Sequence, residues 1–104
     1  MGRPKTRAAD GLKPYRVQWG SPNNPAPTVD YAHHKDAKDK AVNVVTALQQ
    51  QYGKYDRELH SACQIAIGDI RGTDIDGKTS DTPFERRLES PIPFIIKLWR
   101  ERNE

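Results

Sequence analysis

Cysteine and histidine are the side chains through which this chain could bind zinc or carry out nucleophilic catalysis. Cys63 follows His60 by three residues, which places both on one edge of a helix, and His33 and His34 are further candidate ligands. Structural zinc sites usually contain closely spaced pairs of cysteines, whereas this chain has one cysteine. Cys63 also falls on the apolar stripe of a predicted helix, where burial makes a thiol a poor nucleophile. We therefore expect no metal ion, no cofactor and no catalytic residue.

Three carboxylates between residues 74 and 85 have the spacing of calcium ligands. Asp74, Asp76 and Glu85 occupy the first, third and twelfth positions of a calcium-binding loop. The fifth position of such a loop is an oxygen ligand and the sixth is glycine, but this chain has Lys78 and Thr79 there. Because an ammonium group at the fifth position repels the metal ion, we expect a polar loop without calcium.

The positive charge of the chain is concentrated near its N-terminus. The first 20 residues contain five lysines and arginines and one acidic residue, hence a charge of +4, whereas the whole chain carries +3. The remaining residues are close to neutral, so any attraction for a polyanion is local to this segment. The predicted nucleic-acid-binding residues are Arg3, Lys5, Arg7, Lys13 and Arg16.

The sequence GRPK at the start of the chain resembles the core of the AT-hook, a short DNA-binding motif with an Arg-Gly-Arg-Pro centre. The resemblance implies that Arg3 enters the minor groove of A·T-rich duplex DNA, where the narrow groove concentrates negative potential. It also implies that Lys5 and Arg7 contact phosphates. Met1 stands where the family has its first arginine, so one groove-binding arginine remains. The alternative interpretation is a solvated basic leader that binds nothing.

Residues 14–20 have the alternating pattern of a half-buried strand, and residues 28–31 can return as its partner to give a hairpin over 15–31. The aromatic rings in the first strand could stack on unpaired bases, and the basic side chain between them could contact the phosphates. Packing of both rings in the core accounts for the same pattern and is the favoured interpretation. The residues concerned are Tyr15, Arg16, Gln18 and Trp19.

Two longer segments have the periodicity of amphipathic helices. Residues 35–52 place their apolar side chains in one stripe. Residues 56–71 show a similar stripe, and although the alternation within 61–68 also permits a strand, helix is the favoured interpretation. Towards the C-terminus, helix-start signals predict a short helix over 82–89 and a terminal helix over 91–103. The apolar stripe of the terminal helix contains Ile95, Ile96 and Trp99, and Lys97 points outward.

These patterns together predict an α+β, helix-dominated fold, in which an N-terminal β-hairpin is followed by three to four helices around one small core. Residues 1–13 are expected to be a flexible basic arm and residues 14–104 a single small globular domain. No stretch reaches the length of a membrane span, and a single cysteine excludes a disulfide scaffold. We therefore expect a cytoplasmic protein without a membrane partner.

Two functions fit this organisation. The first is a small non-enzymatic nucleic-acid-binding accessory or regulatory protein, whose arm contacts DNA phosphates and the minor groove. The second is a protein–protein interaction module or inhibitor that binds a partner protein through its helical body. In the second case the arm contributes only solubility or electrostatic steering. The choice between DNA and RNA, and the oligomeric state, stay open at this stage.

Overall fold

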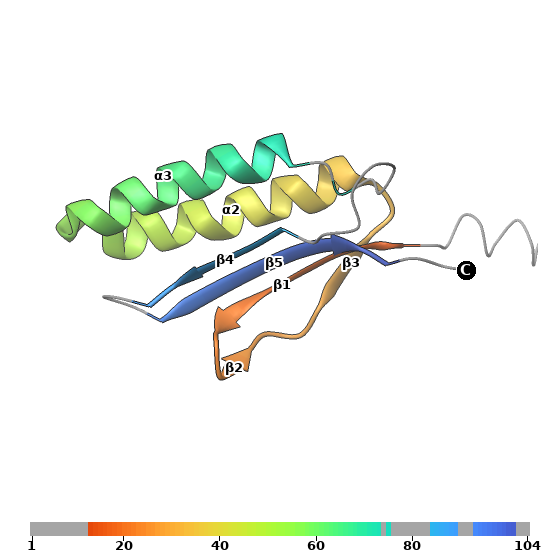
Figure 1. Ribbon diagram of the computed structural model, residues 1–104, viewed down its shortest axis with the longest axis horizontal. Helices are drawn as coiled ribbons and strands as arrows, with labels where there is room; N and C mark the ends of the chain where they lie inside the picture. Colours follow the sequence, from red (N-terminus) through yellow and green to blue (C-terminus); the bar gives the residue numbers. More distant parts are fainter. Residues whose placement is uncertain (1–12, 74, 76–83, 90–92, 102–104) are drawn as a thin grey trace, which may run out of the picture.

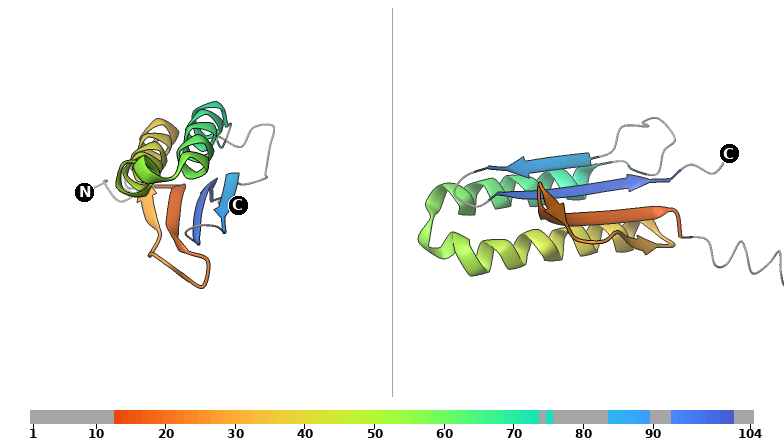
Figure 2. Two further views of the ribbon diagram at one scale, coloured as in Figure 1. Left: turned by 90° about the vertical axis from the view of Figure 1, so that its left-hand side faces the viewer. Right: turned by 90° about the horizontal axis from the view of Figure 1, so that it is seen from below.

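The protein has two layers, an antiparallel β-sheet and a pair of helices that cover one face of it (Figures 1 and 2). The structure, a computed structural model, describes residues 13–73, 75, 84–89 and 93–101. In chain order the elements are β1 (Tyr15–Ser21), β2 (Asn24–Pro25), β3 (Val29–Tyr31), α2 (His34–Tyr52), η1 (Gly53–Tyr55), α3 (Arg57–Gly72), β4 (Phe84–Leu88) and β5 (Phe94–Arg100).

β1 and β5 are the central strands of the sheet. The strand order is β2-β1-β5-β4, and β3 also pairs with β1, so that β2 and β3 together form the return arm of the N-terminal hairpin. All pairs are antiparallel, and β1 pairs with β5 from Tyr15 opposite Arg100 to Gly20 opposite Ile95. The start of β1 and the end of β5 therefore lie together at one end of the sheet (Figure 1). The hairpin predicted over 15–31 is confirmed.

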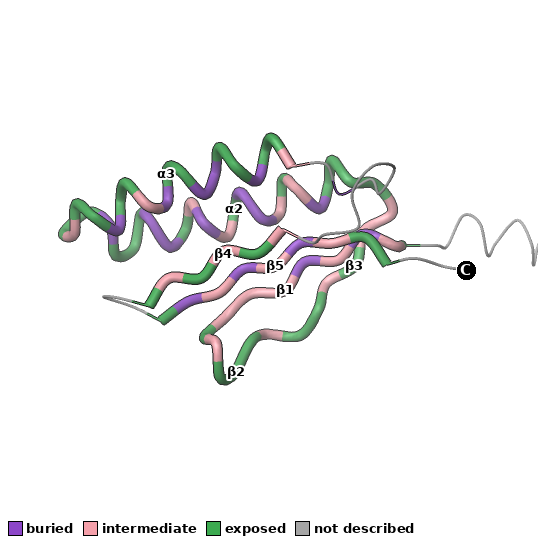
Figure 3. Tube along the Cα trace, viewed as in Figure 1, coloured by how far each residue is buried: buried purple, intermediate pink, exposed green. Residues whose placement is uncertain are grey.

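The hydrophobic core lies between the sheet and the two helices. At the start of β1 and along most of β5, buried residues alternate with partly accessible ones (Figure 3). Ala37 and Ala41 of α2 are completely buried, and their small size lets the helix approach closely to its neighbours. The largest fully buried side chains come from both layers and are Val17, Val45, Leu59, Cys63, Ile70, Ile96 and Leu98.

Both long helices agree with the expectations from periodicity. α2 confirms the helix predicted over 35–52, and α3 confirms the one predicted over 56–71, so residues 61–68 are helical. The carboxylate of Asp56 caps α3 by accepting a hydrogen bond from the backbone N–H of Leu59 at 2.9 Å. Neither of these helices has the length and apolar character needed to cross a membrane.

The prediction for the C-terminal part of the chain is wrong. The segments expected to form helices over 82–89 and 91–103 contain the strands β4 and β5. Among the described residues the fold therefore has two α-helices against a five-stranded sheet, and the expected helix-dominated fold with three to four helices is corrected to a two-layer α+β fold. Thr82 and Pro83, the predicted helix-start residues, lie outside the described residues.

The error has a physical reason in β5. Both faces of this strand carry apolar side chains, so a subset of them also fits the spacing of a helical stripe. Ile95, Ile96 and Trp99 are β-branched or aromatic residues, which pack well on a pleated surface. The strand is stabilised by pairing with β1 and β4 on its two sides, and β1 is distant in sequence. The apolar pattern within this segment is therefore compatible with a helix, but pairing with the distant strand β1 makes it a strand.

Candidate nucleic-acid interface

One face of the sheet has no described helix packed against it. Both α2 and α3 pack on the opposite face, and no described helix or strand covers this side (Figure 2). The strand register and the alternation of side chains define the residues that point to it. We call this surface the outer face, and its residues are Arg16, Gln18, Asp30, Glu85, Arg87, Ile95, Lys97 and Trp99.

Trp99 is the aromatic side chain of the outer face. It lies in β5 opposite Arg16 of β1 and is half-buried. The ammonium group of Lys97 lies 5.1 Å from the centre of the indole ring, within the range of a cation–π contact. The indole N–H donates a hydrogen bond to Oε1 of Glu101 at 3.4 Å. Trp99 thus has polar contacts that fix its orientation on an uncovered surface.

Most cations of the outer face are paired with carboxylates. Arg16 lies 3.4 Å from a carboxylate oxygen of Asp30 and 3.5 Å from one of Glu101. Arg87 lies 3.8 Å from a carboxylate oxygen of Glu85. Such exposed pairs contribute at most about 1 kcal/mol each to stability, but they neutralise the charge of the two arginines. Lys97, by contrast, has no carboxylate of a described residue within ion-pair distance.

The start of β1 and the end of β5 carry two cations at one end of the sheet, and Arg100, which lies opposite Tyr15, is on the side of the helices. Lys13 is exposed immediately before β1, and Arg100 is exposed at the adjacent end of β5. The guanidinium group of Arg100 lies 5.6 Å from the ring centre of Tyr15, and the ring of His34 lies 5.9 Å from the same ring. Neither Lys13 nor Arg100 has an ion pair with a described carboxylate. We refer to Lys13 and Arg100 as the rim cations.

The structure brings together some of the residues predicted from the sequence. Lys13 and Arg16 lie at the same end of β1, whereas Arg3, Lys5 and Arg7 lie outside the described residues.

The aromatic residues of β1 face the helix layer. Tyr15 is buried in the core, and Trp19 packs against the core with the ammonium group of Lys40 5.1 Å from its ring centre. The favoured packing interpretation agrees with this arrangement. Sequence reasoning missed Trp99 and Lys97, because it placed the tryptophan on the apolar stripe of a helix. The alternation of the segment FIIKLWR would have indicated their shared face.

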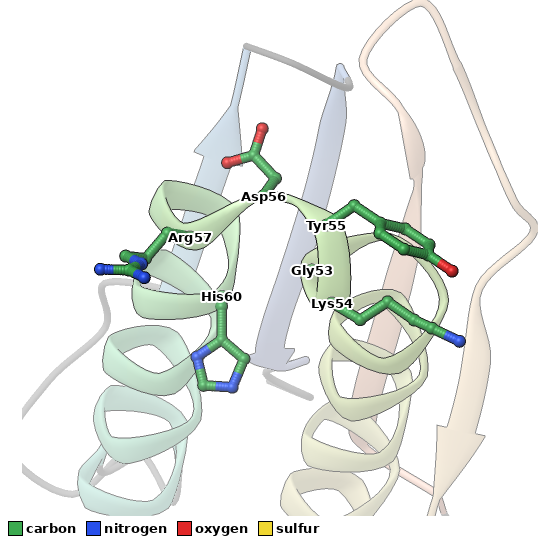
Figure 4. A pocket seen from close by; sticks show the side chains of 6 residues that line it. All are labelled: Gly53, Lys54, Tyr55, Asp56, Arg57 and His60. Atoms are coloured by element: carbon green, nitrogen blue, oxygen red, sulfur yellow. The ribbon is translucent and has the colours of Figure 1, made fainter.

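The turn between the two helices contains a hollow of about 440 Å³ (Figure 4). The side chains around it diverge: Lys54 and Tyr55 point to one side and Arg57 to the other, while His60 points along α3 (Figure 4). No nucleophile, base and orienting group converge there. The lining residues are Gly53, Lys54, Tyr55, Asp56, Arg57 and His60.

The candidate metal ligands are not brought together in the described part of the chain. His60 is exposed on α3 while Cys63 is buried in the core. Glu85 lies on the outer face beside Arg87, and its expected calcium partners Asp74 and Asp76 lie outside the described residues. No group of three or more acidic, histidine or cysteine side chains in the described ranges has the geometry to hold a metal ion.

Burial raises the pKa of the Cys63 thiol above its ordinary value. The native thiol therefore keeps its proton at a pH where the thiol of the unfolded chain, with a pKa of about 8.5, has lost it. The native state then binds more protons than the unfolded state, so the free energy of unfolding falls as the pH rises above that value. At neutral pH, which is below the pKa of the unfolded thiol, the contribution of Cys63 to the free energy of unfolding is fully present.

The native protein should resist thiol-modifying reagents at Cys63. At about pH 8 iodoacetamide should leave the native chain unmodified, because only the exposed thiolate reacts readily. The same reagent should modify Cys63 completely in concentrated guanidinium chloride, which serves as the control. Mass spectrometry gives both results, and stoichiometric modification of the native chain would contradict the observed burial.

Comparison with protein-family models, with curated proteins and with solved structures gave no match to this chain. The strongest candidate site is the end of the sheet where the rim cations meet the outer face. Lys13, Lys97 and Arg100 are cations without a described carboxylate partner. Lys97 lies beside the ring of Trp99 on the outer face, and Arg100 lies beside the ring of Tyr15 on the side of the helices.

Proposed function

We propose that this chain is a non-enzymatic nucleic-acid-binding protein whose basic N-terminal segment binds the phosphates and the minor groove of duplex DNA. The observation that carries this proposal is the position of the rim cations. Lys13 lies between the basic segment and β1, and Arg100 lies opposite Tyr15 at the adjacent end of β5. The cations of the segment and those of the rim can therefore act on one polyanion.

The charge distribution favours DNA binding at one end of the molecule over DNA binding across its whole surface. Residues after the first 20 are close to neutral, and their Arg86 and Arg87 are paired with carboxylates, as is Arg16 at the end of the basic segment. Phosphates would be repelled by the acidic partners in these pairs. Attraction for DNA is consequently strongest at the N-terminal segment and the rim, where positive charge exceeds negative charge.

Replacing Arg3, Lys5 and Arg7 together by alanine should lower the salt dependence of duplex binding. The slope of log K against log salt should fall by about 2.7 units, because each phosphate contact on duplex DNA contributes about 0.9. Arg3→Ala alone should also remove any preference for A·T-rich duplex, whereas Lys5→Ala should weaken binding to all duplexes about equally. Fluorescence anisotropy of labelled A·T-rich and G·C-rich duplexes over a salt series measures both effects.

Lys54→Ala provides the matched control for these substitutions. Lys54 is exposed in η1, in the turn between α2 and α3, at the other end of the molecule from the start of β1 (Figure 1). Its removal changes the net charge by the same amount as Arg3→Ala or Lys5→Ala alone but should leave the slope unchanged. Undetectable duplex binding at about 50 mM salt, where electrostatic attraction is strong, or an unaltered slope in the triple variant, would refute the proposal.

A protein partner is the second candidate, because apolar side chains are exposed on the helical hairpin. Tyr55 is 85% exposed, Ile65 of α3 is 59% exposed and Tyr52 is 42% exposed. Exposed aromatic and aliphatic groups of this kind serve as anchors at protein interfaces. A partner that remains bound after nuclease treatment, and is lost from the double variant Tyr55→Ala and Ile65→Ala, would favour this function over DNA binding.

A further inference from the structure

We propose that Trp99 and Lys97 on the outer face form a binding site for unpaired nucleotides of a single strand. Trp99 provides the surface on which a base stacks, and Lys97 contacts the adjoining phosphate. This inference rests on the proposed function. It adds that the folded domain binds single-stranded nucleic acid, whereas the basic N-terminal segment is proposed to bind duplex DNA.

The geometry around Trp99 suits a stacking site. The ring lies on a central strand of a face that no described element covers, and it is only half-buried. The carboxylate of Glu101 accepts a hydrogen bond from the indole N–H, and the ammonium group of Lys97 lies over the ring, so a base that stacks on this side of the ring displaces Lys97 from it. A base can stack on such a ring whatever its identity, because every base has a π-face. A cation beside the ring adds attraction for the phosphate of the same nucleotide.

The charges of the outer face restrict what can bind there. Asp30 and Glu101 pair with Arg16 on one side of the ring, and Glu85 pairs with Arg87 on β4. A duplex laid across the whole face would place phosphates against these carboxylates. Lys97 lies opposite Glu85 in the register of β4 and β5, but no ion pair joins the two, so Lys97 is the outer-face cation without a described ion-pair partner. The charge pattern therefore fits a short single-stranded stretch, of which one base stacks on Trp99.

Tryptophan fluorescence tests the stacking contact directly, because the chain contains two tryptophans. In the variant Trp19→Phe, Trp99 is the only tryptophan, and titration with a dT oligonucleotide should quench its emission in a saturable manner. In the reciprocal variant Trp99→Phe, the remaining Trp19 packs against the core on the helix side and should show no quenching. Equal emission of Trp99 with and without oligonucleotide would overturn the inference.

Affinity measurements provide a second test. Trp99→Leu should weaken binding of a labelled dT oligonucleotide roughly 5- to 150-fold, the loss expected for one stacked base. Tyr55→Leu, which removes an aromatic ring that is 85% exposed in η1, should leave the affinity unchanged. Circular dichroism of each variant confirms that it is folded before binding is compared. Equal affinities of the wild type and Trp99→Leu would refute the stacking site.

The outcomes separate this inference from the proposed function. Loss of quenching with intact duplex binding refutes the Trp99 site alone. Quenching without any duplex binding refutes the role of the basic N-terminal segment and leaves the Trp99 site standing. A dimer in solution, with Trp99 emission that depends on protein concentration in the absence of DNA, would show that a second copy covers the outer face and would overturn the inference.

Discussion

Replacing Ile96 by alanine should lower the free energy of unfolding by about 2 to 5 kcal/mol, as measured by urea denaturation followed by circular dichroism. Ile96 is 1% exposed and lies in the middle of β5, between Trp19 of β1 and Arg86 of β4. Truncation leaves a cavity between the sheet and the helices, which a close-packed core fills only in part. A loss of this size is a large fraction of the about 5 to 15 kcal/mol that stabilises a typical domain.

Ile95→Ala is the matched control, because the same side chain at the adjacent position points to the outer face. It should cost about 1 kcal/mol or less, since it is only half-buried and truncation there leaves no enclosed cavity. In the helix predicted over 91–103, both isoleucines would lie on one apolar stripe and contribute similarly. Equal losses at the two positions would therefore contradict the strand.

Replacing Gly20 by alanine should destabilise the protein by about 3 kcal/mol, because strain and a steric clash act together. Gly20 has a φ of 137°, a conformation that residues with a Cβ atom rarely adopt. A Cβ atom there would lie 2.8 Å from the backbone N of Ala26 and from Cα of Pro25. Both contacts are with backbone, so the neighbours cannot move aside without disturbing the pairing of β1 with β2. Thermal and urea unfolding both measure this loss.

Gly68→Ala is the control for the glycine substitution and should have the opposite sign. Gly68 is exposed within α3, and a Cβ atom there would meet nothing within 4 Å. Alanine is favoured over glycine in a helix by about 0.5 to 1 kcal/mol, so this variant should be slightly more stable than the wild type. Destabilisation at both glycines would indicate a general effect of substitution and not the strained turn at Gly20.

The candidate site was only partly predictable. The excess of cations near the N-terminus is a property of composition, and it indicated Lys13 and Arg16 without any structural information. The structure shows that Arg16 is neutralised by Asp30 and Glu101, which lie in separate parts of the chain. Trp99 could be recognised as a candidate ligand contact only after β5 had been identified as a strand with one uncovered face.

The sequence by itself determined the elements whose signals are local. The stripes of α2 and α3 and the alternation of β1 follow from side chains within one segment, so periodicity identified all three. The C-terminal segment was decided by tertiary structure, because pairing of β5 with β1 brings together residues about 80 positions apart. With apolar side chains on both faces of β5, periodicity alone could not tell a strand from a helix. In the folded protein Phe94, Ile96 and Leu98 face the helices and are buried in the core, whereas Trp99 lies on the outer face.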